Sequence, residues 1–184
     1  MSCFSVTVFC GSNPGNDPAY ANGAQMLGKE LAAHQIQLVF GGGNVGLMGQ
    51  VASAVLNAGG KVVGIIPDFL RQREIPIHDL TELCVTDSMH TRKRRLFALG
   101  DAFVVLPGGL GTYDETFEIL TWKQLGLHNK PIILVNLCGW ADIFTHVIEE
   151  TIARGFAKPA IRDLFEVQPD IPSTVARLAT LSSS

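Results

Sequence analysis

The chain has 184 residues, 47% of them hydrophobic and 17% charged, which is typical of a compact globular protein. Its net charge of −3 argues against a surface that binds nucleic acid through bulk positive charge. We see no apolar run of about 20 residues that could cross a membrane. The N-terminus also lacks the basic residues followed by an apolar segment that are typical of a signal peptide. We therefore expect one domain, residues 1–184, in a soluble cytoplasmic protein that binds neither nucleic acid nor a membrane.

Apolar runs alternate along the chain with segments of helical periodicity. In chain order we predict a strand at Ser5–Cys10, a helix near Pro18–His34, a strand at Gln37–Phe40, a helix near Leu47–Ala58, strands at Lys61–Ile66 and Glu82–Val85, a helix at Met89–Leu99, a strand at Ala102–Leu106, a helix at Tyr113–Gln124, a strand at Pro131–Asn136, a helix at Trp140–Arg154 and a last helix after Pro172. The segment Pro67–Thr81 has no clear period, and we expect a loop or short helix there. The alternation predicts an α/β fold, a single-domain Rossmann-like doubly wound parallel sheet.

Three glycine- or hydroxyl-containing turns follow predicted strands. They are Gly11-Ser12, Gly41–Gly46 and Gly108–Thr112. In doubly wound sheets, ligands bind beyond the carboxyl ends of the strands, so we expect these turns to meet at one edge. Ser12, Gly42 and Gly43 are accordingly candidate ligand contacts.

The segment Pro107–Glu115 is the most informative of these turns, because it joins an apolar strand to the start of a helix. Glycines let the backbone approach a ligand, and the free N–H groups and dipole of a helix N-terminus favour an anion. Glu115 follows one turn later, as a carboxylate beside an expected phosphate site. It is either an acid/base or cation-stabilising group, or the second half of a Thr112–Glu115 capping box.

The pattern Gly41-x-Gly43-x-x-Gly46, with Asp68 after the next strand, allows a dinucleotide-binding interpretation. That fingerprint normally follows the first strand, whereas this one follows the second. Tight turns alone would also explain the glycines. A P-loop is excluded, because no Gly-Lys-Ser/Thr follows either glycine run.

Four consecutive basic residues, Arg92–Arg95, open the helix predicted at Met89–Leu99. Cations at a helix N-terminus oppose its dipole, so an anionic group should compensate them. Arg94 and Arg95 suit a solvated face, but Arg92 lies near the edge where the glycine turns end. His90 is either an acid/base group or a surface residue. The histidines and cysteines have no metal-ligand spacing, and we expect no metal.

These segments resemble a known family. Pro107–Glu115 is similar to the PGGxGTxxE signature of the LONELY GUY (LOG) proteins, and Met89–Lys93 to their M-x-x-R-K element. Cys10–Ser12, Gly41–Gly49 and Leu120–Gly126 are similar to further blocks of that family in the same order. The resemblance implies a cytokinin riboside 5′-monophosphate phosphoribohydrolase, which releases an adenine-type base and ribose 5-phosphate. Many such relatives are labelled lysine decarboxylase, yet nothing here resembles a pyridoxal-phosphate site.

The resemblance also implies roles for individual residues. Arg92 and Glu115 correspond to the catalytic pair of the family. Substrate-binding positions correspond to Glu74, Met89, Lys93, Gly108, Gly109, Leu110, Gly111, Thr112 and Thr121. The family implies a homodimer, no metal and no organic cofactor.

Cleavage of an N-glycosidic bond passes through a ribosyl cation, which a carboxylate such as Glu115 stabilises while it orients or deprotonates water. Arg92 would position phosphate or ribose, or offset charge on the departing base. The turn Gly108–Thr112 would hold the 5′-phosphate. A nucleotide carrier or sensor, or an NAD(P)-dependent oxidoreductase, remains an alternative. Whether the substrate is AMP or N6-modified AMP stays open.

Overall fold

The structure is a computed structural model that describes residues 3–71, 77 and 79–183. Its strands are β1 (Ser5–Phe9), β2 (Gln37–Phe40), β3 (Val62–Pro67), β4 (Glu82–Thr86), β5 (Ala102–Val105), β6 (Ile132–Val135) and β7 (Glu166–Gln168). Its helices are α1 (Pro18–Ala33), α2 (Gly46–Asn57), α3 (Asp68–Arg71), α4 (Met89–Leu99), α5 (Leu110–Gln124), α6 (Trp140–Ala153) and α7 (Ile171–Ser182), with two short 3-10 helices, η1 (Leu137–Gly139) and η2 (Pro159–Leu164).

The seven strands form one sheet in the order β4-β3-β2-β1-β5-β6-β7, and all the pairs are parallel. The predicted doubly wound parallel sheet is therefore confirmed. The chain builds outward from β1 to β4, then crosses back to place β5 on the other side of β1. At such a reversal of strand order the chain leaves β1 and β5 toward helices on opposite faces of the sheet, and ligands bind at this position in open α/β sheets.

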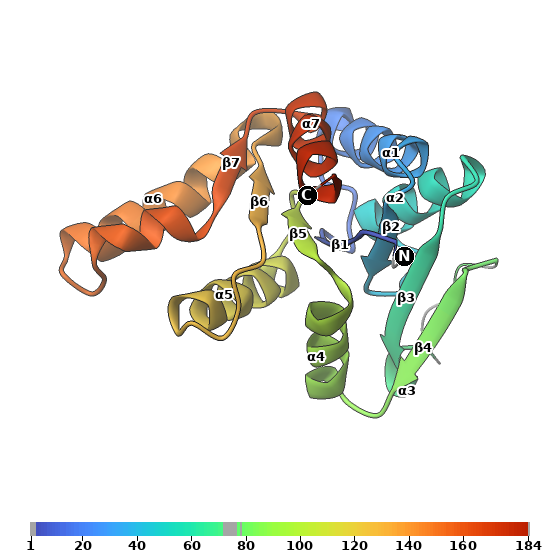
Figure 1. Cartoon of the computed structure of the whole chain (residues 1–184), viewed down its shortest axis with the longest axis horizontal. Helices are drawn as coiled ribbons and strands as arrows, with labels where there is room; N and C mark the ends of the chain where they lie inside the picture. The colour runs from blue at the N-terminus through green and yellow to red at the C-terminus, as the bar shows by residue number, and fades with distance from the viewer. Residues whose placement is uncertain (1–2, 72–76, 78, 184) are drawn as a thin grey trace.

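Two hydrophobic cores cover the two faces of the sheet. Side chains of α1, α2 and α7 pack with one face, and those of α4, α5 and α6 pack with the other; Figure 1 shows these two layers of helices. The inner strands are largely apolar on both faces for this reason: Val8 of β1 belongs to the first core, and Phe9, the next residue, belongs to the second.

The start of one helix and the presence of one strand differ most from the sequence prediction. Helix α5 begins at Leu110, three residues before the predicted start, because the backbone turns into the helix directly after Gly109. The strand β7 was not predicted. It has only three residues, two of them the polar Glu166 and Gln168, and it pairs with one neighbour at the sheet edge. No apolar run marks such a strand.

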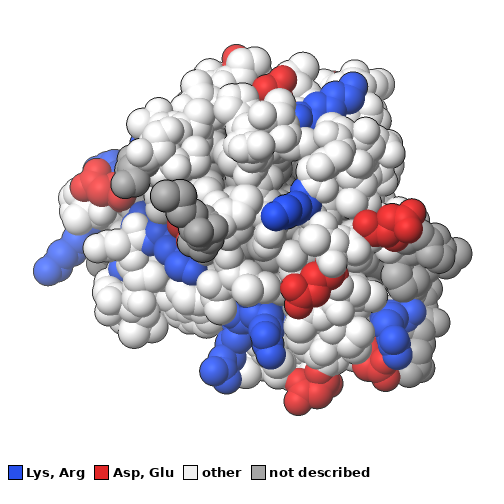
Figure 2. Space-filling model, turned by 45° about the vertical axis from the view of Figure 1, so that its right-hand side comes forward, with Lys and Arg blue, Asp and Glu red and all other residues white. Residues whose placement is uncertain are grey.

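The expected loop or short helix at Pro67–Thr81 is in part the short helix α3, and residues 72–76 and 78 of this segment lie outside the described residues. None of the described helices is long and apolar enough to cross a membrane. On the face drawn in Figure 2, acidic and basic side chains are interspersed, without one broad basic area.

Candidate active site

The turns after β1 and β5 touch each other at the carboxyl edge of the sheet. The backbone N–H of Gly11 donates to the carbonyl oxygen of Pro107 at 3.0 Å. A side chain on Gly108 would collide with the hydroxyl of Thr112 and lie 2.8 Å from the backbone nitrogen of Gly11. Glycine at position 108 therefore allows a contact between the two turns that any other residue would obstruct.

A cavity of about 590 Å³ opens at this junction. Its walls come from the turn after β1, the start of α2, the segment Pro107–Thr112 and the side chains of Arg92 and Glu115. The cavity thus combines the turn Gly108–Thr112, which we expected to bind an anion, and the turn after β1 with the two charged residues, Arg92 and Glu115, that are the candidates for catalysis.

Arg92 reaches this cavity from the first turns of α4. Ser88 caps that helix, since its side-chain oxygen accepts a hydrogen bond from the N–H of Thr91 at 3.2 Å. Arg92 is 9% exposed; its Nε donates to the carbonyl of Ile65 at 3.1 Å and its Nη2 to the carbonyl of Gly41 at 3.2 Å. Two carbonyl groups, at β3 and just after β2, therefore fix the plane of the guanidinium.

Gly41 has a structural role in this arrangement, because a Cβ atom there would collide with Nη2 of Arg92. The run Gly41–Gly46 thus makes room for a cation, a use that the dinucleotide interpretation did not anticipate. Gly42 packs against Ile65 and Ile66 instead. Asp68, the expected ribose ligand of that interpretation, accepts a hydrogen bond from Arg71 at 2.9 Å.

Glu115 is the anionic partner that the basic start of α4 requires. Its Oε1 lies 3.4 Å from Nη1 of Arg92, and the two side chains are 13% and 10% exposed. Burial raises the pKa of Glu115 to about 7, although the charge of Arg92 opposes that rise. The carboxyl group is therefore close to half ionised at neutral pH, which suits a group that exchanges protons or meets a transient cation.

The capping-box interpretation of Glu115 is wrong. The residue before the first turn of α5 is Gly109, no side chain caps this helix, and Thr112 lies within it. Glu115 consequently lies in the second turn and points to Arg92 rather than back to the backbone of Thr112.

The N-terminus of α5 forms the other wall of the cavity. The N–H of Tyr113 donates to the carbonyl of Gly109 at 3.1 Å, so the preceding N–H groups, at Leu110, Gly111 and Thr112, have no carbonyl partner one turn earlier in the helix. These three residues line the cavity. Unpartnered N–H groups, the helix dipole and Arg92 together make this wall suitable for an anion.

The structure brings together most of the predicted site. Ser12, Arg92, Gly108, Gly109, Leu110, Gly111, Thr112 and Glu115 all line the cavity. Gly42, Gly43, Met89, Lys93 and Thr121 do not line it. Glu74 lies outside the described residues.

The residues that lie away from the cavity have other contacts. Lys93 forms ion pairs of 3.2 Å with both Asp114 and Glu118 on α5. The hydroxyl of Thr121 donates to the carbonyl of Phe117 at 2.7 Å, one turn earlier in the same helix. Met89, at the start of α4, is 38% exposed.

Sequence reasoning missed several residues of the cavity wall, among them Tyr20, Leu70 and Trp140. Trp140 also donates a hydrogen bond from its indole nitrogen to the carbonyl of Gly108 at 3.3 Å. No local pattern could have linked α6 to a turn about 30 residues earlier; the contact exists because β6, next to β5, directs the chain back to the same edge.

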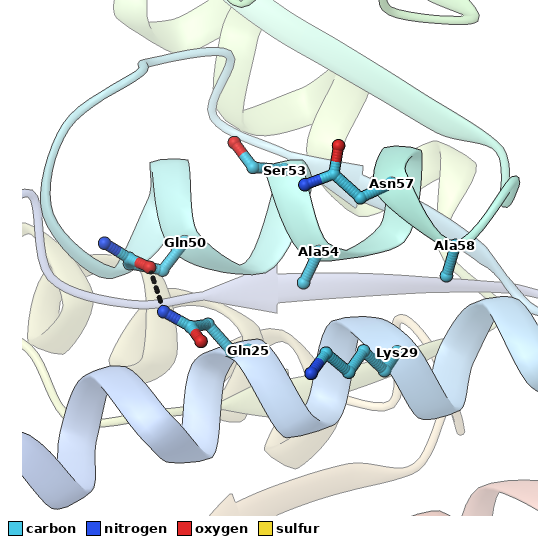
Figure 3. Close-up of a pocket in the computed structure, with 7 residues that line it drawn as sticks. All are labelled: Gln25, Lys29, Gln50, Ser53, Ala54, Asn57 and Ala58. Carbon is cyan, nitrogen blue, oxygen red and sulfur yellow. Dashed lines mark hydrogen bonds between the residues drawn. The ribbon is translucent and has the colours of Figure 1, made fainter.

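A second groove, of about 410 Å³, lies between α1 and α2 (Figure 3). Gln25 donates to Gln50 across it at 2.6 Å, and Lys29 is the one charged residue among the described residues that line it. None of the predicted site residues that the structure describes belongs to it. Within residues 3–71, 77 and 79–183, no three His, Cys, Asp or Glu side chains are grouped as a metal site would require.

A family model described as possible lysine decarboxylase matches residues 48–178. The probable cytokinin riboside 5′-monophosphate phosphoribohydrolase LOGL9 of Oryza sativa subsp. japonica is 46% identical over 173 residues, covering 94% of this chain and 76% of that protein. The cytokinin riboside 5′-monophosphate phosphoribohydrolase of Rhodococcoides fascians is 46% identical over 175 residues, covering 95% and 88%. The chain belongs to the LOG family.

Solved structures support the fold of this LOG-family chain. The molybdenum cofactor carrier protein of Chlamydomonas reinhardtii superposes with a TM-score of 0.74 at 21% identity, covering all of both chains. A structural genomics target, TM1055, gives 0.73 at 24% identity, covering 96% of this chain and 99% of that one. At such identities the likeness extends to the fold alone.

Proposed function

We propose that this LOG-family chain hydrolyses the N-glycosidic bond of adenine nucleoside 5′-monophosphates, either AMP or N6-modified AMP. The products are the free base and ribose 5-phosphate. The observation that carries the proposal is the buried Arg92–Glu115 pair, which lies in the same cavity as the uncapped N-terminus of α5. The names of the relatives that match most of the chain support the same reaction.

The 5′-phosphate binds at Gly108–Thr112, which lines the cavity and includes the first turn of α5, whose N–H groups have no carbonyl partner within the helix. Phosphate lies at one end of the substrate and the scissile bond near its middle. Binding energy from the phosphate therefore serves to hold the ribose in place for reaction.

Glu115 faces C1′ of the ribose. As the bond to the base breaks, positive charge develops on the ribose, and the ionised carboxylate stabilises it and orients the attacking water. Burial makes this stabilisation larger than it would be in water, because charges interact more strongly in a medium of low polarity.

Arg92 has a role set by its hydrogen bonds. Two of its N–H groups are occupied by the carbonyls of Ile65 and Gly41, and a third faces Glu115. Its remaining donors and its charge serve the substrate, by attracting the phosphate or by offsetting negative charge on the departing base. A fixed guanidinium also keeps Glu115 oriented.

A panel of substrates tests this proposal. AMP and isopentenyladenosine monophosphate are offered with adenosine and ATP as controls, and free base is quantified by chromatography. We expect the monophosphates to be cleaved and the two controls to react at least about 100-fold more slowly. Adenosine has no phosphate to bind at the site, and the triphosphate of ATP is too large for it. Equal turnover of adenosine and AMP would exclude a phosphate-directed site. Activity should survive EDTA, because no step requires a metal.

We also propose that the chain forms a homodimer in the cytoplasm, as the family resemblance implies. Leu125 and Leu127, beyond the end of α5, are each 67% exposed and are suitable for burial against a second copy. Light scattering at micromolar concentration should give twice the mass of one chain. The double variant Leu125→Asp, Leu127→Asp should give the mass of one; a wild-type protein of monomer mass would refute the dimer.

A further inference from the structure

Trp140 is the first residue of α6, in a part of the chain where the sequence carries no LOG motif. Its indole nevertheless lines the cavity, and Nε1 donates to the carbonyl oxygen of Gly108 at 3.3 Å. The indole also stacks on the ring of Tyr113, with 5.6 Å between ring centroids and 17° between the ring planes. Trp140 therefore contacts the proposed phosphate turn on one side and the first turns of α5 on the other.

The start of α6 is itself held in place. Gly139 adopts a left-handed conformation, φ 77°, immediately before Trp140. The side chain of Asn136, directly after β6, accepts from the N–H of Ala141 at 2.8 Å and donates to Asp142 at 2.8 Å. These contacts anchor the indole to the sheet, so it acts as a fixed support rather than a loose side chain.

The support acts on the peptide group between Gly108 and Gly109. A trans peptide is planar, with its C=O and N–H pointing in opposite directions, so a donor that holds the carbonyl of Gly108 also sets the direction of the Gly109 N–H. Two successive glycines have wide conformational freedom and would otherwise sample many orientations. The indole N–H selects one of them before substrate binds.

We propose that Trp140 is a positioning residue for the 5′-phosphate: its indole N–H fixes the Gly108–Gly109 peptide, and its stack on Tyr113 fixes the start of α5. The indole N–H itself is engaged with Gly108, so Trp140 acts on phosphate through the turn. This inference rests on the proposed function, because it takes Gly108–Thr112 to be the phosphate site.

The variant Trp140→Phe tests the hydrogen bond separately from the stack, since phenylalanine keeps an aromatic ring against Tyr113 but has no N–H. Calorimetry measures the affinity for two ligands: ribose 5-phosphate, which contains the phosphate, and adenosine, which lacks it. We expect the Kd for ribose 5-phosphate to rise about tenfold, the value of one hydrogen bond. The Kd for adenosine should change less than twofold.

The chain offers a matched control in its other tryptophan. Trp122 packs edge-on against Phe97, 4.9 Å between centroids, and does not line the cavity. Trp122→Phe should leave both affinities unchanged. The sequence has two tryptophans, so the variant Trp122→Phe retains Trp140 alone. The tryptophan fluorescence of this variant should therefore change when ribose 5-phosphate is added.

Three results would overturn the proposal: an unchanged Kd for ribose 5-phosphate in Trp140→Phe, an equal loss for adenosine, or Trp140 fluorescence that does not respond to saturating ribose 5-phosphate. An equal loss for both ligands would mean that Trp140 supports the cavity in general. Failure of the proposed function is a separate result, because a wild-type protein that binds ribose 5-phosphate but releases no base would refute hydrolysis and leave the comparison of affinities intact.

Discussion

Glu115→Gln separates catalysis from structure, because glutamine keeps the size of the side chain and can still accept a hydrogen bond from Arg92. If the carboxylate stabilises the ribosyl cation and orients water, turnover of AMP should fall roughly 10²–10⁴-fold. Binding of AMP should persist or tighten, since a negative charge next to the phosphate is removed.

The same substitution should stabilise the folded protein at high pH. Burial raises the pKa of Glu115 to about 7 from an ordinary 4.5, which corresponds to about 3 kcal/mol against the ionised form. Since the folded state holds this proton more tightly than the unfolded state, wild-type stability falls as the pH rises from about 4.5 to 7. The free energy of unfolding of Glu115→Gln should exceed that of wild type by about 1–3 kcal/mol at pH 8, and the difference should shrink toward pH 4.5.

Urea unfolding at several pH values, with base release and calorimetric AMP affinity on the same samples, measures these effects. Glu166→Gln is a matched control, because Glu166 also binds an arginine, Arg177, at 2.8 Å, yet that contact lowers the pKa of Glu166. This control should keep full activity and should lose stability rather than gain it near neutral pH. Normal base release from Glu115→Gln, or a stability difference that does not vary with pH, would refute the reasoning.

Three further predictions concern the same site. Arg92→Ala should lower kcat/KM about 100-fold or more, and far more than Arg94→Ala or Arg95→Ala does. Arg92→Lys should not restore kcat/KM, because an ammonium group cannot donate to three acceptors in one plane. Similar losses in all three alanine variants would indicate that the basic residues act only through their combined positive charge. Gly41→Ala should lower kcat/KM at least about tenfold with an unchanged circular dichroism spectrum, since the new methyl group displaces Arg92. In wild type, kcat/KM should rise with pH to a plateau above about 7, as Glu115 ionises, and Glu115→Gln should lack this step; a fall in kcat/KM above pH 7 would instead assign Glu115 the role of an acid.

Five of the six strands that the sequence predicted lie inside the sheet, where both faces are covered, and the sixth, β4, lies at its edge. Runs such as Ala102–Leu106 are continuously apolar because helices cover them from either side, and that pattern is visible in one sequence. The edge strand Glu166–Gln168 has no such pattern, since polar residues at its two ends are half-buried. This strand forms because it pairs with β6, and such a long-range pairing cannot be predicted from the hydrophobic pattern of three residues.

The candidate site was predictable where it depends on local chemistry. Ser88 places the start of α4, that start places Arg92, and a cation at a helix N-terminus requires an anion, which the structure provides as Glu115. The backbone acceptors of Arg92 were not predictable, because a carbonyl group carries no sequence signal. Trp140 was missed for a related reason, since its contact depends on the order of β5 and β6 in the sheet.

The hydrolysis of an adenine nucleoside monophosphate is the central claim, and product analysis tests it most directly. Purified wild-type protein is incubated with isopentenyladenosine monophosphate in EDTA, and both products are quantified. We expect free base and ribose 5-phosphate in equal amounts, with both lost together in Arg92→Ala and in Glu115→Gln. A wild-type protein that binds the nucleotide yet releases neither product, or that releases the base equally well in both variants, would contradict the claim.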